Sequence, residues 1–293
     1  MLDLQNVTKT FGNVKALDDL TMTVPRGAVY GLGGPNGAGK STAIRCLLGV
    51  YRPDCGTVTL DGAPVYENPV AKARIGSIPD DIFYFPSATM EDMRKFYQGI
   101  YPKFDQTLYY KLFEAFDLPK KAPLRRFSKG MQKQAAFHLT LCTRPEVLVL
   151  DEPVDGLDPV MRRQVWSLIL SEVAKEETTV LISSHNLREL EDICDHVGIM
   201  DHGRMLLQRS LADMQGATHK LQLVGNIPEG LEILHQNQSG RLTTLIVRGK
   251  AEDIAAKAQA AQCVYFDVLP LSLEEIFIYE LGGVNYEVKN IVL

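Results

Sequence analysis

Hydrophobic and polar positions alternate along the start of the chain, over residues 2–11 and 15–24. Alternation with a period of two is typical of a strand with one buried face, and Gly12-Asn13 between the two segments is a hairpin signal. Two later segments, Val147–Leu150 and Thr178–Ser184, are apolar almost without interruption, which indicates strands buried on both faces of a parallel sheet. Shorter apolar runs predict further strands at 28–32, 57–60, 74–78, 197–200 and 205–208.

Helical spacing of apolar residues begins near residue 83 and is clearest over Glu91–Ile100 and Gln106–Phe116. Aromatic side chains are dense in this stretch, and we attribute them to a core or to a partner-helix interface rather than to a cofactor site. Further helices are expected at about 128–143, 159–175, 186–194 and 210–215. Strands and helices therefore mix along the chain, as in an α/β protein.

The pattern changes after Gly216. Short strands are predicted at 220–224, 231–235, 242–247 and 264–268, an alanine-rich helix at 251–262, and a helix at 272–281 opened by the capping box Ser272-Leu273-Glu274-Glu275. We therefore divide the chain into a first domain, 1–216, with a helical part at about 83–143, and a small accessory α+β domain, 217–293. No candidate chemistry is found in the second.

Composition narrows the class of protein. The net charge of −5 is not the basic charge that is typical of nucleic-acid-binding proteins, so we expect no nucleic-acid partner. No apolar run reaches the roughly 18 residues that a membrane span needs, and the N-terminus does not look like a signal peptide. The five cysteines are scattered and include no C-x-x-C pair, which favours a reducing compartment over disulfides or a zinc site.

The segment from Gly34 to Ser41 fits the pattern G-x-x-x-x-G-K-[ST] of a phosphate-binding P-loop. Its glycines let successive backbone N–H groups point at one anion, Lys40 supplies a charge for the β- and γ-phosphates, and the Ser41 hydroxyl can ligate Mg²⁺. A helix beginning near Lys40 adds its positive end. The nucleotide-binding residues predicted here are Gly34, Pro35, Asn36, Gly37, Ala38, Gly39, Lys40, Ser41 and Thr42.

Two carboxylates, Asp151 and Glu152, stand at the carboxyl end of the buried run 147–150, where ligands bind in parallel sheets. In that position Asp151 is the Walker B acid that reaches Mg²⁺, and Glu152 is the candidate general base that orients the attacking water. His185 ends the strand expected beside this one. A lone histidine is usually structural, but here a contact with the γ-phosphate is credible. Lys40, Glu152 and His185 are thus the predicted catalytic residues.

In combination these motifs resemble the ATP-binding subunits of ABC transporters, over about residues 2–215. Gly34–Thr42 matches Walker A, Val147–Glu152 matches Walker B, and Ser128-Lys129-Gly130-Met131-Gln132 matches the LSGGQ signature, with Phe127 for its leucine. Gly156-Leu157-Asp158 matches the D-loop and His185 the switch histidine. Phe11, which alone reads as a core residue, falls where the family places an aromatic that stacks on adenine.

The resemblance implies a P-loop ABC cassette with a mixed core sheet, an antiparallel β subdomain and a helical subdomain. It also implies an ATPase that uses ATP and Mg²⁺, in which two like or unlike subunits pair head to tail. Each nucleotide would lie between one P-loop and the Ser128, Gly130, Gln132 and Asp158 of the second subunit. Closure of the pair would drive separate transmembrane permease subunits, at the cytoplasmic face of the cell membrane.

Two departures and one short motif qualify this reading. Asp80 replaces the Q-loop glutamine, so it could ligate Mg²⁺ or alter coupling to the permease, and Lys129 replaces one signature glycine. The phrase Ser272–Phe277 resembles the tail of ABC-2 type exporters and favours export. The alternatives are a soluble ABC ATPase acting on ribosomes or DNA, and a regulatory subunit that does not hydrolyse ATP.

Overall fold

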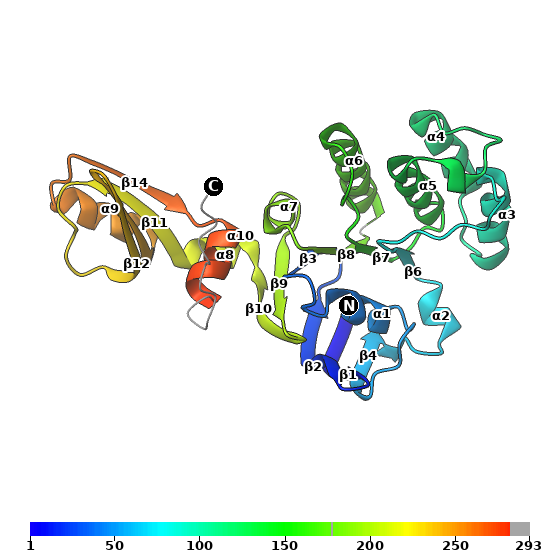
Figure 1. The fold of residues 1–293 in the computed structure, drawn as a ribbon, viewed down its shortest axis with the longest axis horizontal. Helices are drawn as coiled ribbons and strands as arrows, with labels where there is room; N and C mark the ends of the chain where they lie inside the picture. Colours follow the sequence, from blue (N-terminus) through cyan, green and yellow to red (C-terminus); the bar gives the residue numbers. More distant parts are fainter. Residues whose placement is uncertain (177, 282–293) are drawn as a thin grey trace. The chain divides into compact units, whose positions relative to one another are not determined.

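The computed structural model describes residues 1–176 and 178–281, and Figure 1 shows their strands and helices. Two compact units are present. The first consists of Met1–Asn186 with Gly198–Leu207, and the second of Leu187–Val197 with the described residues from Gln208 on. The mixture of strands and helices confirms the α/β class. A boundary between independently folding domains at residue 216 stays a prediction.

The first unit opens with an antiparallel sheet in the order β2-β1-β4-β5. Phe11 pairs with Val14 across Gly12-Asn13, so the predicted hairpin is confirmed. One face of this sheet contributes residues such as Leu4 and Met22 to a core shared with Ile44 and Leu47 of the first helix. The elements concerned are β1 (Leu2–Phe11), β2 (Val14–Val24), β4 (Cys55–Leu60), β5 (Ala63–Pro64) and α1 (Lys40–Leu47).

A six-stranded sheet forms the centre of the chain, in the order β10-β9-β3-β8-β7-β6. Its last four strands run parallel to one another. Every residue of β3, β7 and β8 is buried, as the apolar runs predicted. These residues are apolar apart from the glycines of β3, the serine and threonine residues of β8, and Asp151 at the end of β7. The strands are β3 (Val29–Gly33), β6 (Ile75–Ile78), β7 (Val147–Asp151), β8 (Thr179–Ser184), β9 (His196–Asp201) and β10 (Arg204–Ser210).

The register of this sheet brings four chain segments to one edge. Ile78 of β6 pairs with Leu150 of β7, Asp151 pairs with Ser183 of β8, and Ser184 pairs with Gly33 of β3. Since parallel strands end at the same edge, the residues that follow these pairs become neighbours. Loops that are far apart in the sequence therefore meet at the carboxyl end of the sheet.

Helices cover the six-stranded sheet, with α5 and α6 on one side and α1 with the antiparallel sheet on the other (Figure 1). Polar caps open them, including Thr89, Asp105 and Ser128. Part of the predicted aromatic cluster is core, because Tyr109 is buried with its ring 4.6 Å from that of His138, whose pKa burial lowers to about 4. The helices are α3 (Met90–Ile100), α4 (Gln106–Phe116), α5 (Lys129–Leu141) and α6 (Pro159–Glu176).

Three short elements were not predicted: β5, α2 (Pro69–Lys72) and the 3-10 turn η1 (Leu124–Arg126) in the basic loop. Each has four residues or fewer, which is too short for a hydrophobic period to register. Helix 186–194 is also shorter than expected, since α7 is Leu187–Glu191.

The second unit contains a four-stranded antiparallel sheet in the order β12-β13-β11-β14, packed on helix α9. Leu221, Leu245 and Val247 of the sheet meet Ile254 and Ala258 of the helix. The predicted capping box is present, and after α10 the chain continues as a π-helix to Leu281 rather than as the expected α-helix. Residues 282–293 of the predicted accessory domain lie outside the described residues. The elements are α8 (Leu211–Ala217), β11 (Thr218–Val224), β12 (Glu232–Ser239), β13 (Leu242–Arg248), α9 (Ala251–Ala260), β14 (Tyr265–Pro270) and α10 (Leu273–Ile276).

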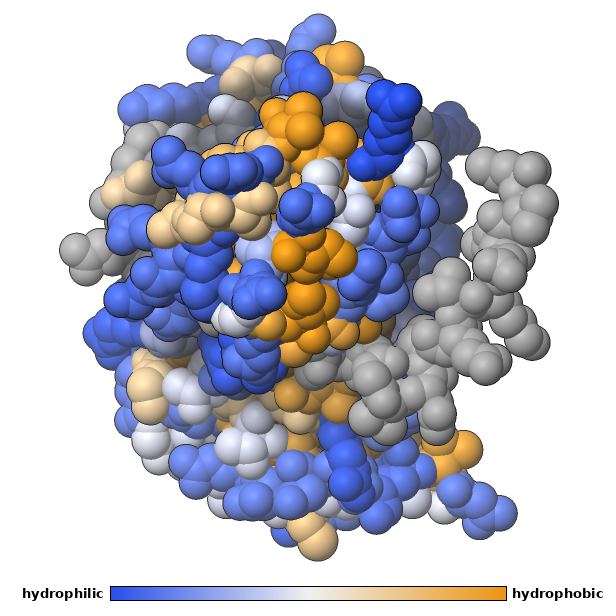
Figure 2. All heavy atoms as spheres, turned by 90° about the vertical axis from the view of Figure 1, so that its left-hand side faces the viewer, coloured by the Kyte–Doolittle hydropathy of each residue, from blue (hydrophilic) through white to orange (hydrophobic). Residues whose placement is uncertain are grey.

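Figure 2 looks onto the molecule from the left-hand side of Figure 1 and shows apolar side chains reaching a largely hydrophilic surface. In the second unit, Val264, Tyr265 and Ile233 are among the large apolar residues that are exposed. Over the part of the chain that the structure describes, no helix combines the length and the apolar character that a membrane crossing requires.

Candidate active site

The P-loop joins β3 to α1 and has a backbone that only glycine can adopt at two critical points. Gly34 has φ 152°, and a Cβ there would lie 2.3 Å from the Met200 carbonyl oxygen. Gly39 has φ 103°, and a Cβ would lie 2.6 Å from the Ala16 carbonyl oxygen. These glycines therefore let the loop pack against two other strands in a conformation that can turn backbone N–H groups toward an anion.

Lys40 begins α1 and folds back across the loop. Its Nζ donates hydrogen bonds to the carbonyl oxygens of Gly34, at 2.7 Å, and Pro35, at 3.3 Å, and the residue is only 6% exposed. The same Nζ lies 3.6 Å from Oε1 of Glu152. The buried ammonium group of Lys40 is thus held beside the loop that would bind phosphate, by hydrogen bonds that it can exchange for bonds to phosphate oxygens.

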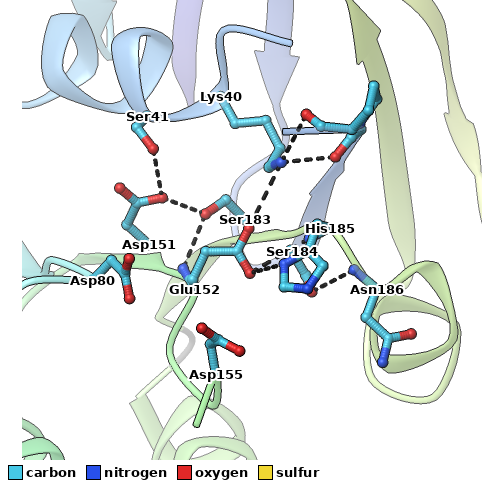
Figure 3. Close-up of polar contacts among 12 residues, drawn as sticks. Lys40, Ser41, Asp80, Asp151, Glu152, Asp155, Ser183, Ser184, His185 and Asn186 are labelled. Carbon is cyan, nitrogen blue, oxygen red and sulfur yellow. Dashed lines mark hydrogen bonds and ion pairs between the residues drawn. The ribbon is translucent and has the colours of Figure 1, made fainter. Parts of the chain in front are cut away.

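Asp151 ends β7 with its carboxylate between two hydroxyl groups. Its Oδ1 accepts from Ser183 Oγ at 2.6 Å and from Ser41 Oγ at 3.3 Å (Figure 3). Serine and carboxylate oxygens are ligands that suit Mg²⁺, which also keeps several waters and phosphate oxygens in such sites. Among the described residues no three His, Cys, Asp or Glu side chains gather as a metal site.

Glu152 stands at the centre of the site in a left-handed backbone conformation, with φ 46°. Such a conformation costs a residue with a Cβ about 1–3 kcal/mol and persists where the surroundings enforce it. Its N–H donates to Ser183, and its Oε2 lies 2.9 Å from His185 Nδ1 (Figure 3). The carboxylate therefore points toward both Lys40 and His185.

Lys40 and Glu152 border a pocket of about 490 Å³. Its lining contains the P-loop residues Asn36–Thr42 together with Asp80 and Glu152. A smaller pocket of about 130 Å³ adjoins Ser41, Asp80 and Asp151. The pKa of Asp80 is raised by burial, against the effect of Lys133, whose Nζ lies 3.9 Å from its Oδ1.

The structure brings the Walker A and Walker B residues, His185 and Asp80 together, although Gly34, Pro35, Asp151 and His185 are not part of the pocket lining. Five further predicted ligands, all outside the Walker motifs, also lie outside that lining. Phe11 is exposed at the end of β1, with its ring 5.2 Å from that of Tyr51. The other four lie in two helix starts. Ser128 accepts from the Met131 N–H, Gln132 donates to the Phe127 carbonyl, Gly130 lies in the first turn of α5, and Asp158 caps α6 by accepting from Val160 and Met161.

One detail of the signature match needs correction. With Phe127 at the leucine position, the fifth residue of the motif is Met131, and Gln132 lies one residue beyond it. The amide of Gln132 is used within its own helix start, by its hydrogen bond to Phe127. Its role as a nucleotide ligand stays a prediction, as do the roles of the other site residues.

Other residues of the site were not predicted from the sequence. Val14, Lys15 and Ala16 from β2, and His202 and Gly203 from the turn between β9 and β10, also line the pocket. Ser183 holds both Asp151 and Glu152. Its position, one residue before the expected end of a strand beside β7, was the only available signal for this role.

The sequence profile of the family described as ABC transporter matches residues 17–155. The ABC transporter ATP-binding protein YtrB of Bacillus subtilis is 30% identical over 288 residues, covering 97% of this chain and 99% of YtrB. The Nod factor export ATP-binding protein I of Burkholderia lata is 32% identical over 296 residues, covering 96% and 97%. The chain belongs to the ATP-binding subunits of ABC transporters.

A solved structure described as the ATP binding subunit of an ABC transporter has a TM-score of 0.68 and 26% identity, and the match covers 73% of this chain and 92% of that one. The family and the ATPase class predicted from the motifs are therefore confirmed, together with the cassette fold. The two sequence relatives extend over nearly the whole chain, so the second unit belongs to the ABC subunit that they share.

Proposed function

We propose that this subunit hydrolyses Mg²⁺-ATP in the pocket between its P-loop and Glu152, and that the cycle drives export through a separate membrane permease. The observation that carries the proposal is the convergence of Lys40, Glu152 and His185 on one phosphate-binding loop. A glycine-rich turn without function would not need a buried ammonium, a strained carboxylate and a histidine around it.

In this mechanism the triphosphate lies on the amides of Gly34–Thr42. Lys40 exchanges its bonds to the Gly34 and Pro35 carbonyl oxygens for bonds to the β- and γ-phosphates. Ser41 and Asp151 would hold the Mg²⁺ ion, which would supply positive charge to neutralise the phosphate oxygens. Glu152 accepts the proton of the attacking water, and His185 fixes the Glu152 carboxylate while facing the γ-phosphate.

A second ATP-binding subunit, like or unlike this one, would complete the site. Ser128, Gly130, Gln132 and Asp158 lie outside the lining of their own chain's pocket, at the starts of α5 and α6. A helix start presents backbone N–H groups and the positive end of its dipole, which suit the γ-phosphate exposed on another subunit. ATP would thus join two subunits, and hydrolysis would remove the contact that keeps them closed.

Phe83, Phe85 and Phe96 support a hydrophobic partner beside the site. They are exposed by 71%, 49% and 46%, and their rings form a connected row, with centroids 6.5 and 5.4 Å apart. Phe83 follows Asp80 by three residues. We assign this row, the phenylalanine patch, to the permease, which would hold the subunit at the cytoplasmic face of the membrane.

Export rather than uptake is supported by the relatives named Nod factor export ATP-binding protein I. The Ser272–Phe277 phrase points the same way. We further propose that residues 1–216 form the ABC domain and that 217–293 form an accessory domain of the exporter.

The test is a fractionation experiment. The double variant Phe83→Ser, Phe96→Ser should leave the membrane fraction, while ATP turnover by the purified subunit remains at the parent rate. Val70→Ser, an exposed apolar residue on α2, is the matched control and should stay with the membrane. Retention of the double variant would overturn the permease assignment. Parent protein that sediments with ribosomes would favour the soluble alternative, and ATP binding without turnover would favour the regulatory one.

A further inference from the structure

Lys133, in the second turn of α5, is a buried cation that the mechanism above does not use. It is 6% exposed, and its Nζ donates to the carbonyl oxygens of Glu152 and Asp155, each at 2.9 Å. Its Nζ also lies 3.9 Å from Oδ1 of Asp80. One ammonium group therefore connects α5 with the loop after β7 and the loop after β6.

Burial of this group is costly, since a lysine stem of four carbons can usually carry its charge to water. Burial lowers the pKa of Lys133, against the opposing effect of Asp80, Asp155 and Glu152. Two charge-assisted bonds to carbonyl oxygens compensate for the lost water. The arrangement is thus specific for the backbone of the Glu152–Asp155 loop.

That backbone is strained at Glu152, where φ is 46°. Ser183 holds the N–H of Glu152, and Lys133 holds its carbonyl oxygen, so the peptide groups on both sides are fixed. Without Lys133 the peptide after Glu152 could rotate toward a relaxed conformation. The carboxylate would then move away from Lys40 and His185, which it now approaches at 3.6 and 2.9 Å.

We propose that Lys133 is a positioning residue for ATP hydrolysis, which aims the Glu152 carboxylate into the pocket by holding the backbone from Glu152 to Asp155. The inference rests on the proposed role of Glu152 as general base. In this proposal the Asp80 carboxylate balances the positive charge of Lys133.

Lys133→Met tests this role, because methionine keeps most of the stem and removes the charge and its hydrogen bonds. We expect kcat to fall by about tenfold to a hundredfold, as for a small misplacement of a catalytic group, with the dissociation constant for ATP unchanged within about twofold. Lys111→Met, an exposed lysine on α4, is the matched control and should keep the parent kcat. In a Glu152→Gln background, adding Lys133→Met should change the residual turnover by less than about twofold.

Thermal melting of each variant checks that it is folded. A folded Lys133→Met with the parent kcat would overturn the inference, and so would a loss of ATP affinity as large as the loss of kcat. If the methionine variant does not fold, Lys133→Gln, which can restore one of the two bonds, should give an intermediate kcat, and a parent-level kcat would overturn the inference. Absence of ATP turnover in the parent protein would instead overturn the proposed function.

Discussion

The six-stranded sheet of the first unit and the four-stranded sheet of the second unit are built on different plans, and the candidate active site lies at one edge of the first. In the first unit, β3, β7 and β8 are fully buried and parallel, and polar residues stand where they end. In the second unit, β11 to β14 are antiparallel, and β12 is almost wholly exposed. The ion pair between Arg248 of β13 and Glu232 of β12, at 3.0 Å, lies at the surface.

The difference follows from strand direction. Parallel strands deliver the residues after each of them to one edge, so Gly34, Asp80, Glu152 and His185 meet although they are spread over half the chain. Antiparallel neighbours end at opposite edges, and no such convergence arises. We therefore expect nucleotide chemistry to depend on the first sheet and to be separable from the packing of the second.

The largest effect is expected for Glu152→Gln, which keeps the shape of the side chain and removes the base. Hydrolysis should fall by about 10²–10⁴-fold, while ATP binding is retained and an ATP-dependent dimer accumulates. Steady-state turnover and size-exclusion chromatography with ATP measure the two results. Turnover at the parent rate would remove Glu152 as the base.

Lys40→Ala should come next, because it removes the buried cation from the phosphate-binding loop. Affinity for ATP should fall by about 10²–10³-fold, the loss typical of deleting one member of a buried charge pair. Isothermal titration calorimetry gives the dissociation constant, with Lys111→Ala as the exposed control. An unchanged affinity would show that phosphate binds elsewhere.

Leu245→Ala tests whether the two sheets are separable. Leu245 is fully buried in the second unit, so its truncation should lower the free energy of unfolding of that unit by about 2–5 kcal/mol. ATP affinity should remain within about twofold of the parent value. Leu181→Ala, equally buried in β8, is the matched comparison and should weaken ATP binding as well. Equal loss of ATP affinity in both variants would refute the separation.

The smallest effect is expected for Asp80→Gln, which installs the residue that the ABC family has at this position. A half-exposed carboxylate contributes about 1 kcal/mol or less, so the Mg²⁺ concentration for half-maximal turnover should rise by less than about tenfold. A magnesium titration of the ATPase rate measures it. An unchanged Mg²⁺ concentration for half-maximal turnover would mean that Asp80 is not a metal ligand. Its remaining role would then be to balance the charge of Lys133.

Much of the site could be predicted because its residues are recognisable from their own neighbours in sequence. The glycines before Lys40 and the acids after an apolar run are local patterns with a known use. The α/β class could also be predicted from the local spacing of hydrophobic residues, which repeat every two residues in the hairpin and about every 3.6 residues in α3 and α4.

What could not be predicted depends on which strands pair. Ser183 reaches Asp151 only because β8 lies beside β7, and His202 enters the pocket only because β9 lies beside β3. The left-handed backbone of Glu152 and its bond to Lys133 have no local signature, since the conformation is uncommon for any residue with a Cβ and the sequence around Glu152 does not mark it. Likewise, nothing in Leu187–Val197 indicated that it belongs with the second compact unit.

The packing of the P-loop against β9 also bears on how the protein is made. The Gly203 N–H donates to the Ala38 carbonyl oxygen at 2.9 Å, and Gly34 lies against the Met200 carbonyl oxygen. The segment that braces the loop is thus synthesised more than 150 residues after the loop itself. A nascent chain emerging from the ribosome would carry the complete motif long before the segment that supports it, so we expect ATP to stabilise the fold only after residues 200–203 have been synthesised.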